Sequence, residues 1–206
     1  MDYLRYLLLW LCRMGYSRGF GIHSPTVYAF VRYVVNEHWP YYAYEDLKDK
    51  LRGANRTIRS LCRLLFRISN HLQPKDSLII DPMHPAMRDY ILAGCKHTNI
   101  LEWTESMLQK ALKPEAAVDP KLVNMTFDLA VCPAHLCDKQ LREAIFHHTH
   151  PLSILVVIGI HANRQNREYW NRLIEDERSA VTLDLYSCGI LFFDQTKSKQ
   201  NYLINF

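Results

Sequence analysis

Three histidines are the residues whose type and position most directly suggest chemistry: His84, His135 and His161. Each is predicted to follow the carboxyl end of a strand, the edge where doubly wound sheets bind ligands. A histidine there can take a proton from a substrate hydroxyl, and three together can bind a metal ion. The alternative, three loop histidines that the topology brings near one another, is favoured. Of the three, His161 and His135 are the candidate catalytic residues, and no metal is expected.

A short Cys–His segment overlaps one of these histidines. Residues 132–137 read Cys-Pro-Ala-His-Leu-Cys, which superficially suggests half of a zinc site. Zinc sites usually place two residues between a pair of cysteines, and they need a second pair of ligands. This spacing is different and no second Cys/His pair is evident, so the segment is not interpreted as a metal site.

A row of arginines follows one predicted helix. The spacings between its members are 4, 3, 4 and 4 residues, so they line one side of that helix; they are Arg52, Arg56, Arg59, Arg63 and Arg67. Such a row could follow the phosphates of a nucleic acid. More often it is a wetted face whose arginine stems cover apolar neighbours. The second interpretation is favoured, so nucleic acid is not the expected partner.

Composition and charge limit the classes of function. Apolar residues make up 49% and charged residues 22% of 206 residues, which is typical of a soluble globular protein. Lys and Arg (25) exceed Asp and Glu (21) by four, and the excess lies in the first third of the chain. That basic third could meet an anionic partner, although a solvated surface is the simpler interpretation. Only seven glycines occur, which nearly excludes a glycine-rich phosphate cradle.

The six cysteines and the start of the chain predict a compartment. Most of the cysteines fall inside apolar runs, which favours a reducing environment over a disulfide framework. The apolar run at residues 7–12 is too short to span a bilayer, and no small-residue cleavage site follows it. These features predict a cytoplasmic protein with no membrane span.

Periodicity and capping residues predict the elements that position these side chains. Helices are expected over residues 1–14, from Ser24-Pro25 to before Pro40, and over 55–72, 84–94, 105–112, 138–148 and 166–177. Strands are expected over 77–80, 98–101, 127–132, 152–160, 181–186, 190–193 and 202–206. This alternation predicts an α/β, Rossmann-like, doubly wound and mostly parallel sheet with an antiparallel C-terminal strand. A helical extension (residues 1–72) would precede the Rossmann-like domain (73–206) in one compact unit.

Several segments resemble a known family. They are Gly19-Phe20-Gly21-Ile22-His23-Ser24-Pro25, Val27-Tyr28, Tyr41-Tyr42-Ala43-Tyr44-Glu45, Phe127-Asp128-Leu129, Ile160-His161 and a strand pair around Gly189. The chain resembles the methyltransferase-like proteins of Bacteroidetes bacteria, which are similar to small O-methyltransferases of class I. The resemblance implies S-adenosylmethionine as cofactor and a small hydroxyl-bearing substrate.

The resemblance also implies where the cofactor would bind, and this sequence departs from the family's pattern there. Asp81, His84 and Glu102 are the candidate cofactor residues, with Glu102 suited to ribose hydroxyls. The loop after Asp81 carries two prolines and no glycine, so main chain would approach the cofactor poorly. Only 24 residues separate Glu102 from Phe127, which suggests a deleted unit. The metal carboxylates of the O-methyltransferases are replaced by residues that cannot bind a divalent ion.

Two functional hypotheses follow. The first is a methyltransferase with degenerate cofactor and metal motifs, in which activity is reduced or lost. The second is a non-catalytic binding or assembly protein that uses its basic, aromatic N-terminal third. One set of polar and aromatic residues could contact a substrate or cover the cleft: Arg18, His23, Tyr41, Tyr42 and Glu45. The alternative, in which aromatic residues only dock the N-terminal segment onto the sheet, is favoured. The N-terminal helices could also mediate a homo-oligomer.

Overall fold

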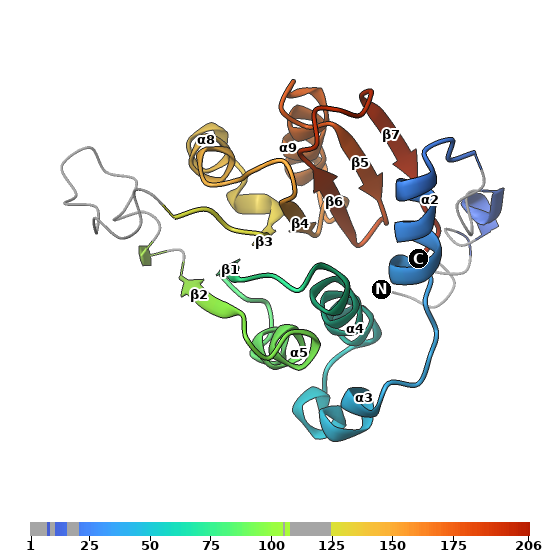
Figure 1. Cartoon of the computed structure of the whole chain (residues 1–206), viewed down its shortest axis with the longest axis vertical. Helices are drawn as coiled ribbons and strands as arrows, with labels where there is room; N and C mark the ends of the chain where they lie inside the picture. Colours follow the sequence, from blue (N-terminus) through green and yellow to red (C-terminus); the bar gives the residue numbers. More distant parts are fainter. Residues whose placement is uncertain (1–7, 9–10, 16–20, 105, 108–124) are drawn as a thin grey trace.

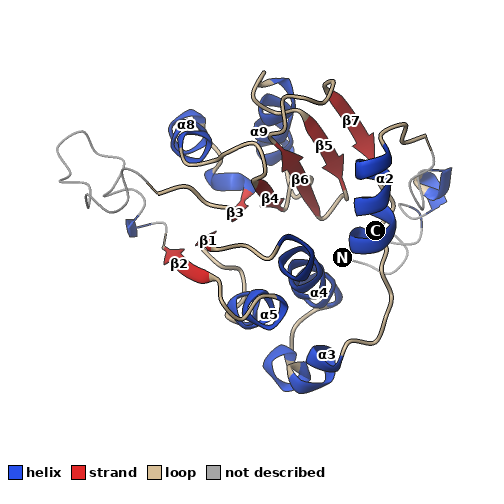
Figure 2. Ribbon diagram, viewed as in Figure 1, coloured by secondary structure: helices blue, strands red, loops and turns tan. Residues whose placement is uncertain are grey.

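A seven-stranded sheet forms the centre of the molecule (Figures 1 and 2). The computed structural model describes residues 8, 11–15, 21–104, 106–107 and 125–206. The strand order is β2-β1-β3-β4-β6-β5-β7. The strands are β1 (Asp76–Ile80), β2 (Asn99–Trp103), β3 (Leu129–Pro133), β4 (Ile154–Ile158), β5 (Val181–Asp184), β6 (Cys188–Phe192) and β7 (Gln200–Leu203).

The α/β, mostly parallel sheet predicted from the alternation of elements is confirmed. Strand β6 runs antiparallel to both of its neighbours, β4 and β5. The last strand, β7, pairs parallel to β5. The antiparallel strand is therefore the sixth, because a tight turn joins it to β5, and the chain end returns to the sheet beside β5.

Helices cover both faces of the sheet. On one face lie α4 (Arg56–Leu72) and α5 (Ala86–Gly94), and on the other lie α8 (Lys139–His147) and α9 (Arg164–Glu175) (Figure 1). Successive residues of a strand point to opposite faces, so Val131 joins the first core and Cys132 the second. Because both faces are buried, the central strands are continuous apolar runs such as Ile154–Ile158.

Close backbone packing and helix capping fix the helices. A Cβ at Gly94 would lie 2.4 Å from the carbonyl oxygen of Phe66, so only glycine allows α5 to approach α4 this closely. Side chains of Asn55, Asp138 and Asn163 accept a hydrogen bond from the first turn of α4, α8 and α9 respectively. These caps place the starts of the helices close to the predicted positions.

The N-terminal third forms α2 (Pro25–Phe30), a π-helical turn η2 (Val31–Val35), α3 (Tyr42–Asp46) and the 3-10 turn η3 (Lys48–Leu51). Phe30 packs edge-to-face on Phe192 of β6 at 5.0 Å, so this segment shares the first core with the sheet. Pro25 occupies the first helical position as predicted, but the Ser24 hydroxyl does not cap the helix. It contacts the Thr26 hydroxyl at 3.1 Å instead.

Two predicted helices fall largely outside the described residues. Of residues 1–14, positions 8, 11 and 12 are helical, and most of 105–112 is not described. The segment between Glu102 and Phe127, in which a deleted unit is predicted, is likewise mostly outside the description. Among the described residues, no helix combines the length and apolar character that crossing a membrane requires.

Candidate functional site

The chain reverses direction across the sheet between β1 and β3. From β1 it moves outward to β2, and it then returns to form β3 on the other side of β1. Ligands of open α/β sheets bind at such a switch point, beyond the carboxyl ends of the strands. Asp81 and His84 follow β1, Glu102 lies next to the end of β2, and His135 follows β3. The topology therefore brings these four predicted site residues to one edge.

The loop after β1 turns sharply at Asp81. The Asp81 amide donates to the carbonyl of Trp103 at 2.7 Å, which ties the ends of β1 and β2 together. The φ angle of Asp81 is +45°, in the left-handed region that glycine adopts most easily and that aspartate tolerates better than most residues. An aspartate thus makes the turn of a loop that carries no glycine.

The same loop offers few hydrogen-bond donors. Pro82 and Pro85 have no amide hydrogen, and the Ala86 amide donates to His84 Nδ1 at 3.2 Å. Within residues 81–87, only the amides of Met83 and His84 find no acceptor among the described residues. The His84 ring orders the start of α5, so its position is set by the loop.

Glu102 is exposed on the outer strand and pairs with an arginine. Arg88 Nη1 lies 3.1 Å from Glu102 Oε1, and the two side chains are 48% and 37% exposed. Such a surface pair contributes about 0–1 kcal/mol to folding, so the carboxylate can exchange its partner at small cost.

His135 is an exposed residue of the 3-10 turn η4 (Ala134–Leu136). Beside it the Sγ atoms of Cys132 and Cys137 lie 3.4 Å apart, both buried. The Cys137 hydrogen bond and burial raise the pKa of the Cys132 thiol well above its ordinary value. Buried neutral thiols are poor metal ligands. In the part of the chain that the structure describes, no group of three or more His, Cys, Asp or Glu side chains could hold a metal ion.

A second polar cluster lies at the ends of β4 and β5. His161 Nε2 lies 2.6 Å from Asp184 Oδ2, and Arg13 Nη1 donates to Asp184 Oδ1 at 2.9 Å. The Tyr186 amide also donates to Oδ1, at 2.8 Å. Burial raises the pKa of Asp184, but the hydrogen bonds and charges of His161 and Arg13 outweigh it and lower the pKa below its ordinary value. Asp184 is therefore an ionised carboxylate with three donors.

Tyr186 covers this cluster. Its ring stacks on His161 at 5.0 Å with an interplanar angle of 11°, and the Arg13 guanidinium lies 5.3 Å from the ring centroid. The φ angle of Tyr186 is +69°, which is a genuine outlier for a bulky side chain. Contacts to both neighbours hold the residue in this strained conformation.

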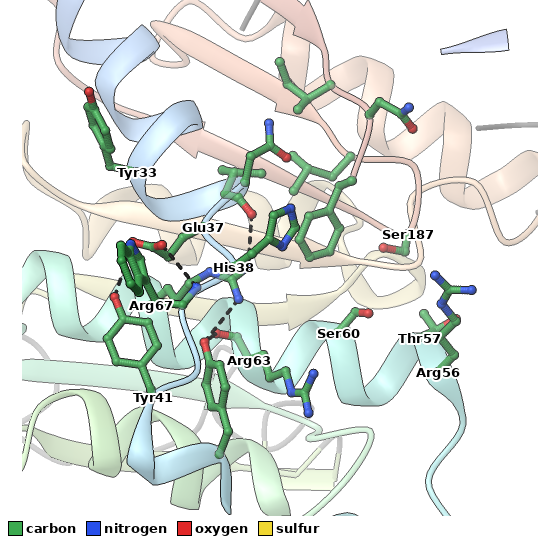
Figure 3. Close-up of a pocket in the computed structure, with 18 of the residues that line it drawn as sticks. Tyr33, Glu37, His38, Tyr41, Arg56, Thr57, Ser60, Arg63, Arg67 and Ser187 are labelled. Carbon is green, nitrogen blue, oxygen red and sulfur yellow. Dashed lines mark hydrogen bonds between the residues drawn. The ribbon is translucent and has the colours of Figure 1, made fainter. Parts of the chain in front are cut away.

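A cavity of about 1510 Å³ opens beside the second cluster (Figure 3). Its walls come from η2 and the loop after it, from one face of α4, from the turn between β5 and β6 and from residues 204–206. Tyr186 and Arg13 line it, whereas His161 does not. Of the expected substrate residues, Tyr41, Tyr42 and Glu45 line the cavity and His23 does not.

Comparison with known proteins identifies the fold. No protein-family model and no curated protein matches the sequence. A methyltransferase of Podospora anserina, PaMTH1, solved with bound S-adenosylhomocysteine, matches with a TM-score of 0.52 and 13% identity over 82% of this chain and 93% of its own. The O-methyltransferase TomG of Streptomyces achromogenes, solved with S-adenosylmethionine, matches with a TM-score of 0.49 and 15% identity over 80% and 93%. The fold is the Rossmann-like fold of methyltransferases.

On this methyltransferase fold, the predicted site residues separate into three places. Asp81 and His84 follow β1, Glu102 is the next-to-last residue of β2, and His135 follows β3. His161 lies in the second cluster. Tyr41, Tyr42 and Glu45 lie at the cavity, while His23 is exposed outside it and Arg18 lies outside the described residues. The sequence did not indicate that His161 and the other two histidines would occupy different places on the edge.

Within the aromatic segment, the three residues differ in environment. Tyr41 is half-buried and its hydroxyl contacts Glu37 at 3.5 Å. Burial, followed by the charge of Glu37, raises the pKa of the Tyr41 phenol. Tyr42 is 92% exposed, and Glu45 forms an ion pair with Lys48. Tyr42 therefore contributes an unshielded aromatic surface and Tyr41 an ordered one.

Three residues of the second cluster were not indicated by the sequence: Asp184, Tyr186 and Arg13. Asp184 stands in a predicted strand, where a single carboxylate suggests only a polar position. Arg13 reaches it from 171 residues away, a separation that no local spacing reveals. A detectable signal is Ser187, because a turn residue a few positions after a strand-end carboxylate marks the edge of the sheet.

Proposed function

We propose that this chain is an S-adenosylmethionine-dependent methyltransferase for a small hydroxyl-bearing substrate, with a cofactor site built from side chains more than from glycine main chain. One observation carries the proposal: Asp81 and Glu102 lie at the carboxyl ends of adjacent parallel strands, next to the switch point of a methyltransferase fold. Ligands of this sheet class bind at that position.

The residues at the switch point suit the chemical groups of this cofactor. Glu102 would accept hydrogen bonds from two ribose hydroxyls after releasing Arg88. The amides of Met83 and His84 would donate to the cofactor's carboxylate. When bound, S-adenosylmethionine supplies an electrophilic methyl group. The chain's own part is to hold the acceptor hydroxyl and remove its proton.

His161 is the residue that we assign to that proton. With Asp184 accepting at Nε2, the tautomer that carries hydrogen on Nε2 leaves Nδ1 with a free lone pair. The carboxylate stabilises the imidazolium that forms when Nδ1 takes a proton. His135 is the alternative, and it is exposed with no carboxylate to orient it.

A specific observation favours the second candidate, a non-catalytic binding protein. Two prolines remove amide donors from the loop after β1, and Arg88 already occupies Glu102. A scaffold with so few donors at the switch point would bind ligands through its N-terminal third instead, where the cavity lies.

Calorimetric titration with S-adenosylmethionine and S-adenosylhomocysteine distinguishes the two candidates. The methyltransferase proposal expects binding by the wild type and about tenfold weaker binding by Glu102→Gln, equivalent to losing one charged hydrogen bond of about 1.4 kcal/mol. Glu168→Gln is the matched control, because Glu168 is also a surface carboxylate paired with an arginine.

Either of two results would reject the methyltransferase proposal with Glu102 in the cofactor site. One is the absence of heat and of any thermal shift at about millimolar cofactor. The other is equal weakening by Glu102→Gln and Glu168→Gln. If the cofactor binds, His161→Gln should abolish transfer of a labelled methyl group to a hydroxyl acceptor while leaving cofactor affinity unchanged.

A further inference from the structure

We infer that the cavity between the N-terminal third and α4 is a binding site for an anionic small molecule that carries an aromatic ring. This inference goes beyond the methyltransferase proposal and does not depend on it, because none of Asp81, His84 and Glu102 lines the cavity.

Charge at the cavity is one-sided. Its lining contains six cationic side chains and two carboxylates: Arg13, Arg32, Lys48, Arg56, Arg63, Arg67, Glu37 and Glu45. The two carboxylates offset only part of this excess, and Asp184, which is outside the lining, pairs with Arg13. Glu45 pairs with Lys48, and Glu37 accepts from the Trp39 amide. A concave surface with one sign of charge concentrates ligands of the opposite sign.

The arginines of the α4 row have separate roles, which corrects the expectation that all of them form one wetted face. Arg67 is 7% exposed, and its guanidinium donates hydrogen bonds to backbone carbonyls within the protein. Its Nε donates to the carbonyl of Val34 at 2.6 Å and its Nη2 to that of Val35 at 3.0 Å, at the end of the π-helical turn. It therefore supports the cavity wall and is not available to a ligand.

Arg63 has the opposite environment. It is exposed, and its guanidinium lies 5.1 Å from the ring centroid of Tyr44, which restricts where it points. Among the described residues it donates no hydrogen bond to an acceptor. A guanidinium held on an aromatic face with its donors free is suited to bind a carboxylate or phosphate.

Hydroxyl donors lie next to Arg63 on the same face of α4. Ser60 and Thr57 stand about one and two helical turns before it, and Figure 3 shows both on the helix that carries Arg63. Neither hydroxyl makes a hydrogen bond to another described residue. The groups that this face leaves unsatisfied are thus a guanidinium and two hydroxyls, and all of them can donate to an anion's oxygen atoms.

Aromatic side chains from η2, the loop after it and α3 form another part of the cavity wall. Tyr33, Trp39 and Tyr42 are 67%, 71% and 92% exposed, although they lie at a cavity. Large aromatic side chains gathered at a concave surface mark a ligand site, since they stack on planar groups. A ligand that satisfies both this wall and the donor face of α4 carries an aromatic ring and an anionic group.

The test uses phenyl phosphate, phenol and inorganic phosphate in calorimetric titrations of the full chain. We expect phenyl phosphate to bind more tightly than either fragment, and its affinity to fall with added salt. Arg63→Gln should weaken phenyl phosphate binding by about tenfold. Arg59→Gln is the matched control, because Arg59 is an exposed arginine of the same helix that lies outside the cavity. It should change the affinity by less than about twofold.

Several results would overturn the inference. They are no binding of phenyl phosphate at about 10 mM, equal affinity for phenol, equal affinity for inorganic phosphate, or equal loss in Arg63→Gln and Arg59→Gln. Displacement of phenyl phosphate by a short RNA that binds more tightly would reject a small-molecule site. Circular dichroism of both variants confirms folding. Glu102→Gln should leave phenyl phosphate affinity unchanged, because Glu102 does not line the cavity. Failure of the cofactor proposal can therefore be distinguished from failure of this inference.

Discussion

Two corners of the same sheet edge hold carboxylates in opposite ways. At the end of β2, Glu102 is 37% exposed at its side chain and has one partner, Arg88. At the end of β5, Asp184 is 7% exposed and accepts from His161, Arg13 and the Tyr186 amide. A carboxylate with one surface partner can exchange it for a ligand, whereas a buried carboxylate with three donors is fixed.

This difference indicates that the β4–β5 corner and the β1–β2 corner have different roles. The β4–β5 corner ties the N-terminal segment to the sheet, since Arg13 also donates to the Asp184 carbonyl at 2.9 Å. It also orients His161. The β1–β2 corner keeps its groups exchangeable. A base must be rigid to be useful, while a ligand site must release its own partners, so we assign these roles to the two corners accordingly.

The largest effect is expected from Asp184→Asn. The amide keeps the shape of the side chain, but one of the two carboxylate oxygens becomes an NH2 group that faces donors instead of accepting from them. The free energy of unfolding should therefore fall by about 2–3 kcal/mol. Urea denaturation measures this. Asp49→Asn is the control, because Asp49 is an exposed partner of Arg52, and it should change stability by less than about 0.5 kcal/mol.

The same variant has a predicted pH dependence. Because the folded-state pKa of Asp184 is lowered, its stabilisation is present above the unfolded-state pKa of about 3.9 and is lost as pH falls through the folded value. The stability difference between wild type and Asp184→Asn should therefore shrink below about pH 4. A difference that stays constant or grows on acidification would show that Asp184 does not act as a charged acceptor.

Local patterns predicted most of the fold, and long-range pairing explains what they missed. The run Ile154–Ile158 is apolar and bounded, and α4 carries apolar residues at helical spacing with Asn55 as its cap, so both elements followed from the sequence. The π-helical turn did not. Its terminal carbonyls accept hydrogen bonds from Arg67, more than thirty residues later. Local periodicity does not predict such a distant partner.

The candidate site was predicted less well for the same reason. Strand ends placed Asp81, Glu102 and His161 on one edge correctly. Which of them would be exchangeable depended on Arg88 and Arg13, and the sequence did not indicate that either arginine pairs with a site carboxylate. The cavity depended on α4 and the β5–β6 turn lying together, which no local spacing specifies.

The two corners also allow a matched backbone comparison, because each contains a non-glycine residue with positive φ. Tyr186→Gly relieves strain but loses the contacts with His161 and Arg13, so we expect a net loss of about 1 kcal/mol. Asp81→Gly relieves strain and removes no hydrogen bond of the side chain among the described residues. Its stability should stay within about 0.5 kcal/mol of wild type, since glycine's greater entropy cost offsets the relief. Urea denaturation of both variants checks the order, and a larger loss in Asp81→Gly would contradict it.

The smallest effect is expected from Glu102→Gln. Both side chains of the Glu102–Arg88 pair are more than one third exposed, so the free energy of unfolding should change by less than about 0.5 kcal/mol. A double-mutant cycle with Arg88→Gln measures the coupling directly. A coupling above about 1.5 kcal/mol would mean that a ligand has to repay that energy before it reaches the carboxylate. Glu102 would then resemble Asp184, and the contrast between an exchangeable corner and a fixed one would fail at the residue on which the cofactor proposal most depends.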